Sequence, residues 1–203
     1  MRALLLVAHP DDDAIFAGAL QRRLSGHTWS VVCLTGGAGA PRGRELLRWQ
    51  ASLGTPARRI HFLGETDDPR DLRDGTCSIP LARVCRRIAG LGLAPDVVVT
   101  HNAAGEYGHP HHVLAHRAAA RVFPATPRLE FARGATPADL RLRCAGKWPR
   151  VAACYRSQWR VVARHWRPSE GFRWATGDGE AGQRGKTTLV SFTACLSNTP
   201  STT

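Results

Sequence analysis

Two uninterrupted apolar runs constrain the fold of this chain more than any other feature of its sequence. Residues 3–8 read ALLLVA and residues 97–99 read VVV, with no polar residue at alternate positions. A strand that faces solvent on one side alternates apolar and polar residues, whereas a strand covered on both faces is apolar throughout. Such strands occur in parallel sheets with helices on both faces, so we expect an α/β fold.

The segments around these runs alternate between strand and helix patterns, which predicts a Rossmann-like, mostly parallel sheet with helices on both faces. The expected strands are residues 3–8, 29–34, 60–63, 96–100 and, as an edge strand, 129–131. The expected helices are residues 14–24, 44–53, 80–91, 112–122, 137–145 and 151–166. These elements predict one domain over residues 1–174. Residues 175–203 are expected to form an extension, with a last strand at 189–192 and a frayed tail at 197–203.

The chain carries a strong positive charge, which raises the question of an anionic partner such as a nucleic acid. Its 203 residues include 28 lysines and arginines against 16 aspartates and glutamates, a formal net charge of +12. Only Lys147 and Lys186 are lysines, and the arginines are spread along the chain without a block of five or six. Binding of nucleic acid through charge stays an alternative, but a solvated basic surface is favoured, and we expect no nucleic-acid partner.

The sequence favours a cytoplasmic protein without a membrane span. No apolar run reaches the ~18–20 residues that cross a bilayer. The first apolar run leads directly into HPDDD at residues 9–13 without a small-residue cleavage site, so it is interpreted as a buried strand rather than a secretion signal. The six cysteines include no pair with CxxC spacing, and Cys33 and Cys85 lie in patterns typical of buried free thiols.

Histidines and carboxylates gather after two of the expected strands. Residues 9–13 (HPDDD) follow the strand at 3–8, and residues 101–112 (HNAAGEYGHPHH) follow the strand at 96–100. Ligands of parallel α/β sheets bind beyond the carboxyl ends of the strands, so we expect the two segments to lie together. Imidazole and carboxylate suit zinc, and a divalent cation would balance the buried acids. The pattern therefore predicts a metal or acid–base site at this edge of the sheet.

Each segment also has a simpler interpretation. An aspartate of HPDDD can cap the helix that begins near Ala14, because Asp is a favoured N-cap and complements the helix dipole. A cap accounts for one aspartate, but not for a histidine and three acids together. A lone histidine is usually a satisfied polar residue, whereas the second segment holds His101, His109, His111 and His112. The sequence has no HExxH, so the usual metalloprotease pattern does not apply.

Four groups of motifs together resemble a known enzyme family. AHPDDD at residues 8–13 resembles the AHPDD(E/D) signature of the PIG-L/LmbE-like zinc deacetylases, which remove N-acetyl groups from glucosamine-containing substrates. GEYGHPHH at residues 105–112 is similar to the second signature of that family, GxYGHxDH. Residues 35–54 (with TGG, RGRE and LG) and residues 155–172 (with YRSQ and EGF) resemble its remaining motifs, in the same order along the chain.

The resemblance implies a catalytic metal centre. His9, Asp12 and His112 would hold one zinc ion per chain and leave one position open for water. Zinc lowers the pKa of bound water towards about 7, so that a nearby carboxylate can complete its deprotonation. Asp11 would be this general base and would then pass the proton to the leaving amine.

The same resemblance implies groups that bind the substrate and the transition state. His109 would be a cationic group beside the developing oxyanion, Tyr107 would be a second donor to that oxyanion, and Arg42 would contact the substrate. Position 111 departs from the family pattern, which has Asp where this chain has His111. His111 could contact the substrate, or it could be a neutral surface residue, which is the favoured interpretation. Replacing His111 with Asp is expected to be tolerated and to raise the pKa of His109.

The motifs predict a metal-dependent hydrolase that removes an N-acetyl or N-acyl group from a small-molecule sugar or glycoconjugate. An amidase that acts on a non-sugar conjugate and a binding protein that has lost catalysis are the alternatives. The loops at residues 36–43 and 64–78 are expected to select the substrate. The aspartates of the second loop could meet sugar hydroxyls, but such a run is more often solvated.

Overall fold

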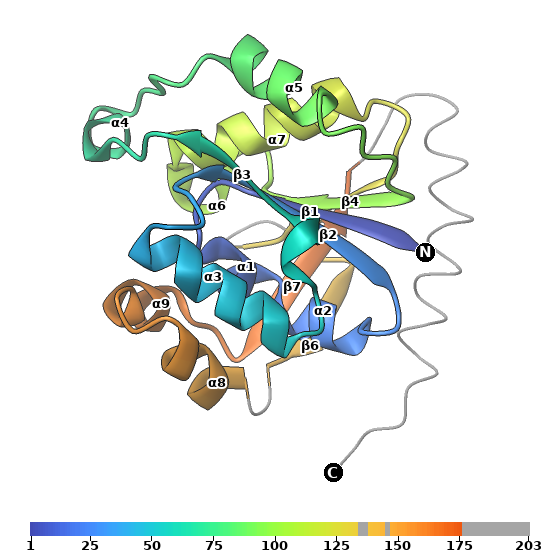
Figure 1. The fold of residues 1–203 in the computed structure, drawn as a ribbon, viewed down its shortest axis with the longest axis vertical. Coiled ribbons are helices and arrows are strands. Elements are labelled where there is room, and N and C mark those ends of the chain that lie inside the picture. Colours follow the sequence, from blue (N-terminus) through green and yellow to red (C-terminus); the bar gives the residue numbers. More distant parts are fainter. Residues whose placement is uncertain (134–137, 145–146, 176–203) are drawn as a thin grey trace.

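A seven-stranded sheet in the order β3-β2-β1-β4-β5-β7-β6 runs through the computed structural model, which describes residues 1–133, 138–144 and 147–175 (Figure 1). Its parallel part consists of β1 (Arg2–Val7), β2 (Thr28–Thr35), β3 (Ile60–Glu65), β4 (Val97–Thr100) and β5 (Arg128–Phe131). The strand β7 (Ser169–Trp174) pairs with β5 in the antiparallel direction, and β6 (Leu140–Arg143) pairs with β7 in the same way. The predicted α/β fold with a mostly parallel sheet is confirmed.

Helices cover both faces of this sheet (Figure 1). One face packs against α5 (Leu81–Ala89) and α7 (Pro110–Val122). The other face packs against α1 (Asp12–Phe16), α2 (Gly18–Arg23), α3 (Pro41–Ser52), α8 (Lys147–Cys154) and α9 (Trp159–His165). The remaining helices are short: a 3-10 turn at Ala57–Arg59, α4 (Pro69–Asp74) and α6 (Gly105–Gly108).

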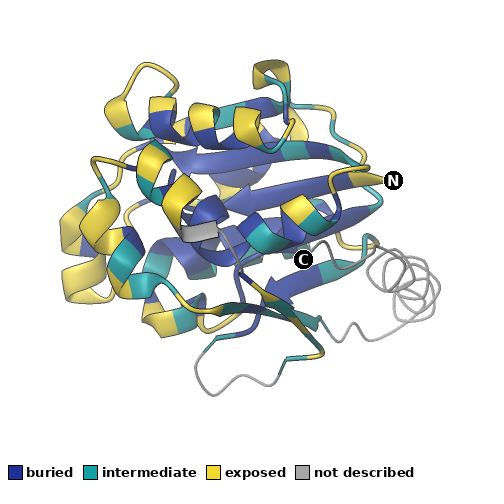
Figure 2. Ribbon diagram, turned by 90° about the horizontal axis from the view of Figure 1, so that it is seen from below, coloured by how far each residue is buried: buried dark blue, intermediate teal, exposed yellow. Residues whose placement is uncertain are grey.

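The apolar run of β1 fills both layers of the core. Leu4 and Leu6 lie in the layer beneath α5 and α7, while Leu5 and Val7 lie in the layer beneath α1, α2 and α3. Figure 2 shows the central strands buried between helices whose outer sides are exposed. Because the strand faces protein on both sides, burial favours an apolar side chain at every position, and not only at alternate ones.

The helix α3 lies tightly against the loop that follows β2. Pro41 occupies the first turn of the helix, where a missing N–H group breaks no helical hydrogen bond. Gly54 follows the helix end with a φ of +86°, a conformation that glycine adopts without strain. Gly43 is required by packing, since a Cβ atom there would lie 1.9 Å from the carbonyl oxygen of Gly37. The start of α3 is thereby held close to the carboxyl end of β2.

The helix predicted at residues 137–145 is wrong. Leu140–Arg143 form the strand β6, whose Leu-Arg-Leu-Arg sequence has the period of two that is typical of a strand. Leu140 and Leu142 pack against the core, while Arg141 and Arg143 are exposed. The pairing depends on β7, a strand that the sequence analysis did not predict. As a result β5 is an internal strand between β4 and β7, and not the predicted edge strand.

The helix predicted at residues 14–24 is broken at Ala17. The first helix, α1, ends at Phe16, and α2 begins at Gly18. The carboxylate of Glu170, on β7, accepts hydrogen bonds from the backbone N–H groups of Ala19 and Leu20 at 2.8–3.1 Å. These N–H groups belong to the first turn of α2 and would lack partners without an acceptor. A residue from the far end of the sheet therefore caps α2.

The helix predicted at residues 151–166 is also broken, at residues 155–158. The Tyr155 hydroxyl donates a hydrogen bond of 2.6 Å to Asp13, which lies in α1. The backbone N–H and the hydroxyl of Ser157 donate to the two carboxylate oxygens of Glu45, in α3. These three hydrogen bonds reach other elements, so the chain leaves the helix here and resumes it in α9.

Some predictions fall outside the described residues. The strand at 189–192 and the frayed tail at 197–203 are among these, and the domain boundary at residue 174 stays a prediction. Cys33 and Cys85 are buried free thiols, as predicted. In the part of the chain that the structure describes, no helix is both long enough and apolar enough to cross a membrane.

Candidate active site

The two polar segments predicted to form a site lie together at the carboxyl ends of β1 and β4. These strands are parallel neighbours, with Leu6 opposite Thr100. His101, the first residue after β4, accepts a hydrogen bond from the backbone N–H of Ala8 through its Nε2 at 3.2 Å. The predicted proximity of the segments is therefore confirmed, and the pairing of two central strands is its cause.

The carboxylate of Asp12, in the first segment, lies between His9 of the same segment and His112 of the second segment. Its Oδ2 is 3.4 Å from His9 Nδ1, and its Oδ1 is 3.5 Å from His112 Nε2. All three side chains are buried. The fold thus brings together the three residues that the resemblance implies as metal ligands.

His112 directs a free ring nitrogen to this point. Its Nδ1 lies 2.6 Å from Oε2 of Glu106, which holds the ring in place. Its Nε2 is buried and has no hydrogen-bond partner within the described ranges. Burial lowers the pKa of His112 to about 4, so the imidazole is neutral at pH 7 and its Nε2 lone pair is available. A histidine with one nitrogen on a carboxylate and the other free is the usual form of a metal ligand.

The surroundings of His9 carry an excess of negative charge. Burial disfavours the imidazolium form of His9, but hydrogen bonds to Asp12 and Asp67 outweigh this effect and raise its pKa to about 10. A buried site that binds a proton so strongly lacks positive charge. A divalent cation in contact with the same carboxylates would supply that charge, so the residues fit such an ion.

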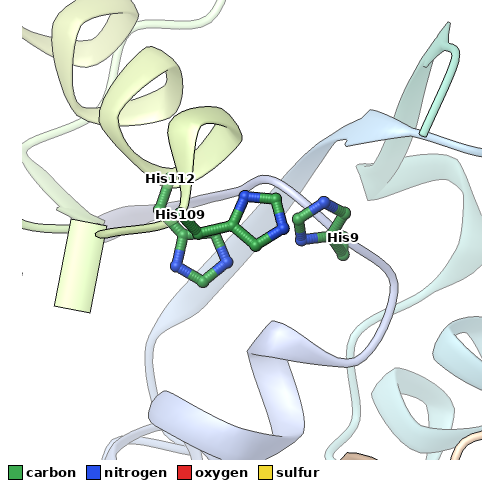
Figure 3. A group of neighbouring side chains, drawn as sticks. All are labelled: His9, His109 and His112. Carbon is green, nitrogen blue, oxygen red and sulfur yellow. The ribbon is translucent and has the colours of Figure 1, made fainter. Parts of the chain in front are cut away.

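His109 is a further candidate ligand. His9, His109 and His112 each offer a ring nitrogen, and these atoms lie within 4.8 Å of one another. Figure 3 shows His109 and His112 reaching from the start of α7 towards His9, which lies in the loop after β1. His109 Nδ1 accepts a hydrogen bond from the backbone N–H of His111 at 3.2 Å.

The protonation of His109 differs from that implied by the resemblance. Burial, together with repulsion from the protonated forms of His9 and His112, lowers the pKa of His109 to about 3. The ring is therefore neutral at pH 7 in the absence of a nearby anion. Since Nδ1 accepts a hydrogen bond, the proton of the neutral ring lies on Nε2, from which it can be donated.

Arg42 forms an ion pair with Asp11. The Nη2 atom of Arg42 donates to Asp11 Oδ1 at 3.1 Å, and its Nη1 donates to Asp67 Oδ2 at 2.7 Å. The other oxygen of Asp11, Oδ2, is buried and has no partner among the residues described. Burial raises the pKa of Asp11, although the charge of Arg42 opposes this. A carboxylate with a raised pKa and one free oxygen is suited to accept a proton.

His111 does not lie at the surface, so that interpretation is wrong. Its exposed fraction is 0%. Its Nδ1 lies 3.1 Å from His9 Nε2, and its Nε2 lies 2.9 Å from Asp71 Oδ2. Asp71, in α4, also accepts hydrogen bonds from the backbone N–H and the hydroxyl of Ser78. A continuous row of side chains, from His9 through His111 to Asp71, therefore connects a predicted metal ligand to a second helix.

Tyr107 lies at the open side of the cluster. Its side chain is 45% exposed, and its ring centre lies 5.2 Å from that of His112 and 6.0 Å from that of His109. The preceding residue, Glu106, has a φ of +59°, the only left-handed conformation of a non-glycine residue in the described ranges. The Glu106 carboxylate compensates for this strain with hydrogen bonds to both His101 and His112.

Four residues of the site were not among the catalytic, metal-binding or substrate-binding residues that the resemblance implies: His101, Glu106, Asp67 and Asp71. His101 and Glu106 lie inside the predicted polar segment, so their position in the sequence was itself a signal. Asp67 and Asp71 lie in the loop predicted to select the substrate. They face His9 and His111 instead, at 3.4 Å and 2.9 Å. Only the tertiary fold brings this loop to the site.

Comparison with known proteins gives a family match. The chain matches the family described as GlcNAc-PI de-N-acetylase (PIG-L) over residues 4–123. It is 32% identical over 161 residues to a 1D-myo-inositol 2-acetamido-2-deoxy-alpha-D-glucopyranoside deacetylase of Thermobifida fusca, with 60% of this chain and 54% of that protein covered. The chain thus spans about half the length of the curated relatives that it matches.

Solved structures share the fold. The N,N'-diacetylchitobiose deacetylase of Pyrococcus horikoshii has a TM-score of 0.65 and 17% identity, and the match covers 86% of this chain and 83% of that one. The 4-carboxy-2-hydroxymuconate hydratase of Pseudomonas putida KT2440 has a TM-score of 0.60 and 17% identity, covering 88% and 97%. One protein is a deacetylase and the other a hydratase, so the shared fold does not decide the reaction.

Proposed function

The chain belongs to the GlcNAc-PI de-N-acetylase (PIG-L) family, and we propose that it is a metal-dependent N-deacetylase of amino-sugar-containing small molecules. The reaction would hydrolyse an amide, release acetate or a longer acyl group, and leave a free amine. The deacetylase names of the relative from Thermobifida fusca and of the structure from Pyrococcus horikoshii support this proposal. The observation that carries it is the buried cluster of His9, Asp12 and His112, with the free oxygen of Asp11 beside it.

We propose that His9, Asp12 and His112 hold one zinc ion. Two imidazoles and a carboxylate are a donor set typical of catalytic zinc, and the partnerless Nε2 of His112 supports its role as a ligand. When bound, zinc would polarise the amide carbonyl and lower the pKa of a water molecule. The position of His109 beside His9 and His112 makes it the alternative third ligand.

In this proposal Asp11 moves the proton. Its free Oδ2 accepts a proton from the attacking water and later returns it to the amine that leaves. Arg42 holds the other oxygen of Asp11, which keeps the carboxylate in one orientation. The side chain of Arg42 already pairs with Asp11 and Asp67. That Arg42 also contacts the substrate stays a proposal.

His109 and Tyr107 are the proposed donors to the oxyanion. His109 would donate from Nε2, because its Nδ1 is engaged by the backbone of α7. The neutral ring is able to act as such a donor. Tyr107 would donate from the exposed rim of the site. Because His111 is fully buried, we propose that it positions His9 and does not touch the substrate.

Measurement of metal content and of amine release tests this function. We expect the zinc-loaded protein to release free amine from N-acetylated amino sugars, and the protein treated with a chelator to release none. His9→Ala and His112→Ala should each bind less zinc, while His27→Ala, which changes a histidine outside the cluster, should bind a full equivalent. Full zinc occupancy in both cluster variants would refute the ligand assignment.

The substrate panel separates the alternatives. Release of amine from a thiol conjugate but from no sugar would indicate an amidase with a non-sugar substrate. Binding of sugars without release of amine would indicate a protein that has lost catalysis. The expectation of a cytoplasmic location without a nucleic-acid partner stays a prediction.

A further inference from the structure

One buried carboxylate, in the short helix α6, contacts two histidines of the site at once. Oε2 of Glu106 lies 2.7 Å from Nδ1 of His101 and 2.6 Å from Nδ1 of His112. The rings of the two histidines are stacked, with 3.9 Å between their centres. The side chains of all three residues are fully buried, with 0% exposed. The carboxylate therefore meets both imidazoles without competition from solvent.

The neighbours of Glu106 hold its carboxylate in one orientation. Oε1 accepts a hydrogen bond of 2.9 Å from the backbone N–H of Asn102, while Oε2 faces the two rings. The side-chain oxygen of Asn102 in turn accepts hydrogen bonds from the backbone N–H groups of Ala104 and Glu106, at 2.9 Å and 3.2 Å. The amide group of Asn102 donates to the carbonyl oxygen of Phe131, on β5. The loop after β4 is thus fixed to the sheet, and the carboxylate is fixed to the loop.

This contact determines which nitrogen of His112 carries the proton. An ionised carboxylate only accepts hydrogen bonds, so Nδ1 of His112 is the donor to Glu106. In a neutral imidazole the other nitrogen then has a free lone pair. That nitrogen, Nε2, lies 3.5 Å from Oδ1 of Asp12 and has no hydrogen-bond partner among the residues that the structure describes. The form of His112 with the proton on Nδ1 is thus the one that can bind a metal ion through Nε2.

The backbone of Glu106 is strained. Its φ of +59° and ψ of −60° are close to those of the classic γ-turn, which is rare and unfavourable for a residue with a side chain. Glycine adopts such angles freely, and the nearby Gly105 and Gly108 have φ values of +67° and +85°. A glutamate therefore destabilises the loop at a position where a glycine would not. Strained residues of this kind are concentrated at functional sites, where the surrounding contacts hold them in place.

We propose that Glu106 is a positioning residue for the metal site: its carboxylate keeps the proton of His112 on Nδ1 in the metal-free protein, so that Nε2 is ready to bind zinc. Glu106 acts only through the ring of His112. This inference rests on the proposed function in taking His112 as a zinc ligand. The position of the proton is a property of the metal-free protein and does not depend on the reaction.

Nitrogen NMR spectroscopy of the metal-free protein, with labelled histidine, tests the position of the proton. The spectrum distinguishes a protonated ring nitrogen from one with a free lone pair, and the signals of His112 are assigned by their loss in His112→Ala. We expect the wild type to carry the proton of this ring on Nδ1. In Glu106→Gly the acceptor is lost, so the form with the proton on Nε2 should appear. The same protonated nitrogen in both proteins, or a proton on Nε2 in the wild type, would overturn the proposal.

Zinc affinity, measured by competition with a zinc-binding dye, shows the consequence of this contact. Glu106→Ala and Glu106→Gly should each bind zinc about 10–100-fold more weakly than the wild type, the usual effect of removing an outer partner of a metal ligand. Glu106→Gln keeps an oxygen that can accept one hydrogen bond and should retain part of the affinity. Glu45→Gln is the matched control, since it changes a buried carboxylate on α3 whose partner is Ser157. Its zinc affinity should equal that of the wild type.

The alanine and glycine variants separate a positioning role from a merely structural one. Both variants lack the carboxylate, but only glycine relieves the strained backbone. The metal-free Glu106→Gly protein should therefore have a higher melting temperature than Glu106→Ala, whereas the two should lose zinc affinity equally. Wild-type affinity in both variants, or affinities that follow the melting temperatures, would overturn the proposal.

An assay of amine release from N-acetylated sugars distinguishes this proposal from the proposed function. If the Glu106 variants lose zinc affinity and the proton of His112 moves, but the wild type releases no amine from any sugar, the positioning role stands and the proposed function fails. If the wild type releases amine, but Glu106→Gly keeps both the proton on Nδ1 and the zinc affinity, the function stands and the role of Glu106 fails.

Discussion

His111 shows how a single residue can change the support of the proposed metal site. The family pattern has Asp at this position, and this chain has an imidazole that spans the gap between His9 and Asp71. The carboxylate of Asp71 therefore comes from α4 and acts on the proposed metal ligand through the His111 ring. Such outer partners orient ligating histidines and determine which ring nitrogen carries the proton.

Asp71→Asn should weaken zinc binding about 10–100-fold, the usual effect of removing an outer partner of a metal ligand. The physical reason is that His111 loses the anion that holds its Nε2, so that it no longer fixes the ring of His9. Asp74→Asn, an exposed aspartate on the same helix that pairs with Arg73, is the matched control. Competition with a zinc-binding dye measures both variants, and equal affinities would contradict the role of Asp71.

His111→Asp should be strongly destabilising, in contrast to the tolerance expected from the sequence. The new carboxylate would be buried where Asp71 Oδ2 and Asp67 Oδ1 lie 2.9 Å and 3.7 Å from the present imidazole. An uncompensated buried charge costs roughly 3–5 kcal/mol of unfolding free energy. Urea denaturation measures the loss. The double variant His111→Asp, Asp71→Asn should recover part of it, and no recovery would argue against charge repulsion as the cause.

Asp11→Asn should keep the fold and the metal but lose ~10²–10⁴-fold in turnover, the typical contribution of a general base. The amide is nearly isosteric with the carboxylate, yet it cannot accept a proton at the free oxygen position. Zinc analysis and kcat on an N-acetylated sugar are measured on the same preparation. Turnover close to that of the wild type would show that Asp11 is not the general base.

Among the elements, the break in the helix predicted at residues 151–166 supports the acidic motif of the site. The loop between α8 and α9 sends the Tyr155 hydroxyl to Asp13, and Gln50 of α3 donates to the other oxygen of the same carboxylate. Asp13 lies next to Asp12, the proposed ligand. The α8–α9 loop and α3 thereby hold the backbone that carries the acidic motif. An uninterrupted helix at residues 151–166 would lack the loop that carries Tyr155.

Tyr155→Phe should destabilise the fold by about 1–3 kcal/mol, the cost of leaving a buried acceptor without its partner. The effect should be larger at pH 8 than at pH 5. Burial raises the pKa of Asp13 from 3.8 to about 7, although hydrogen bonds from Tyr155 and Gln50 oppose it. Asp13 is thus protonated in the folded protein at pH 5 and ionised at pH 8. The hydrogen bond from the Tyr155 hydroxyl should stabilise the fold more when Asp13 is ionised.

The sign of this pH dependence follows from the raised pKa. The stability that protonated Asp13 contributes is fully present below about pH 4 and is lost as the pH rises through about 7. Denaturation curves at pH 5 and pH 8 measure the effect. Tyr107→Phe changes the other tyrosine of the chain, at a half-exposed position, and should show no such difference. A larger loss at pH 5 than at pH 8 for Tyr155→Phe would contradict the account.

Across the whole molecule, the cluster of His9, Asp12 and His112 joins parts of the chain that are distant in sequence. His9 follows β1, and His112 begins α7 after β4, so a bound ion would connect the centre of the sheet to one of its covering helices. The acids gathered there repel one another without a cation. Metal binding should therefore stabilise the entire fold, and not only the loops of the site.

Zinc at 100 times its dissociation constant should stabilise the folded protein by about 2.7 kcal/mol. Removal of this zinc should therefore lower the melting temperature by about 5–10 °C. Thermal denaturation with and without a chelator measures this shift. In His112→Ala the chelator should have little effect, because the variant has already lost a ligand. An equal shift in that variant would place the stabilising metal elsewhere.

The residues of the central strands and of the loops after them were enough to predict the parallel centre of the sheet and the place of the site. A strand that is buried on both faces has an apolar sequence throughout, as in the run of β1, so its burial can be predicted from its own residues. The carboxyl ends of neighbouring parallel strands lie at the same edge of the sheet whatever the conformation of the loops. Three features could not be predicted in this way: the contact of Asp71 with His111, the helix break at Tyr155, and the extension of the sheet by β6 and β7. Each of these depends on a hydrogen bond between residues far apart, 40 positions for Asp71 and His111 and 142 for Tyr155 and Asp13. A local sequence pattern does not predict such a bond, because the partner is determined by how the helices and strands pack against one another.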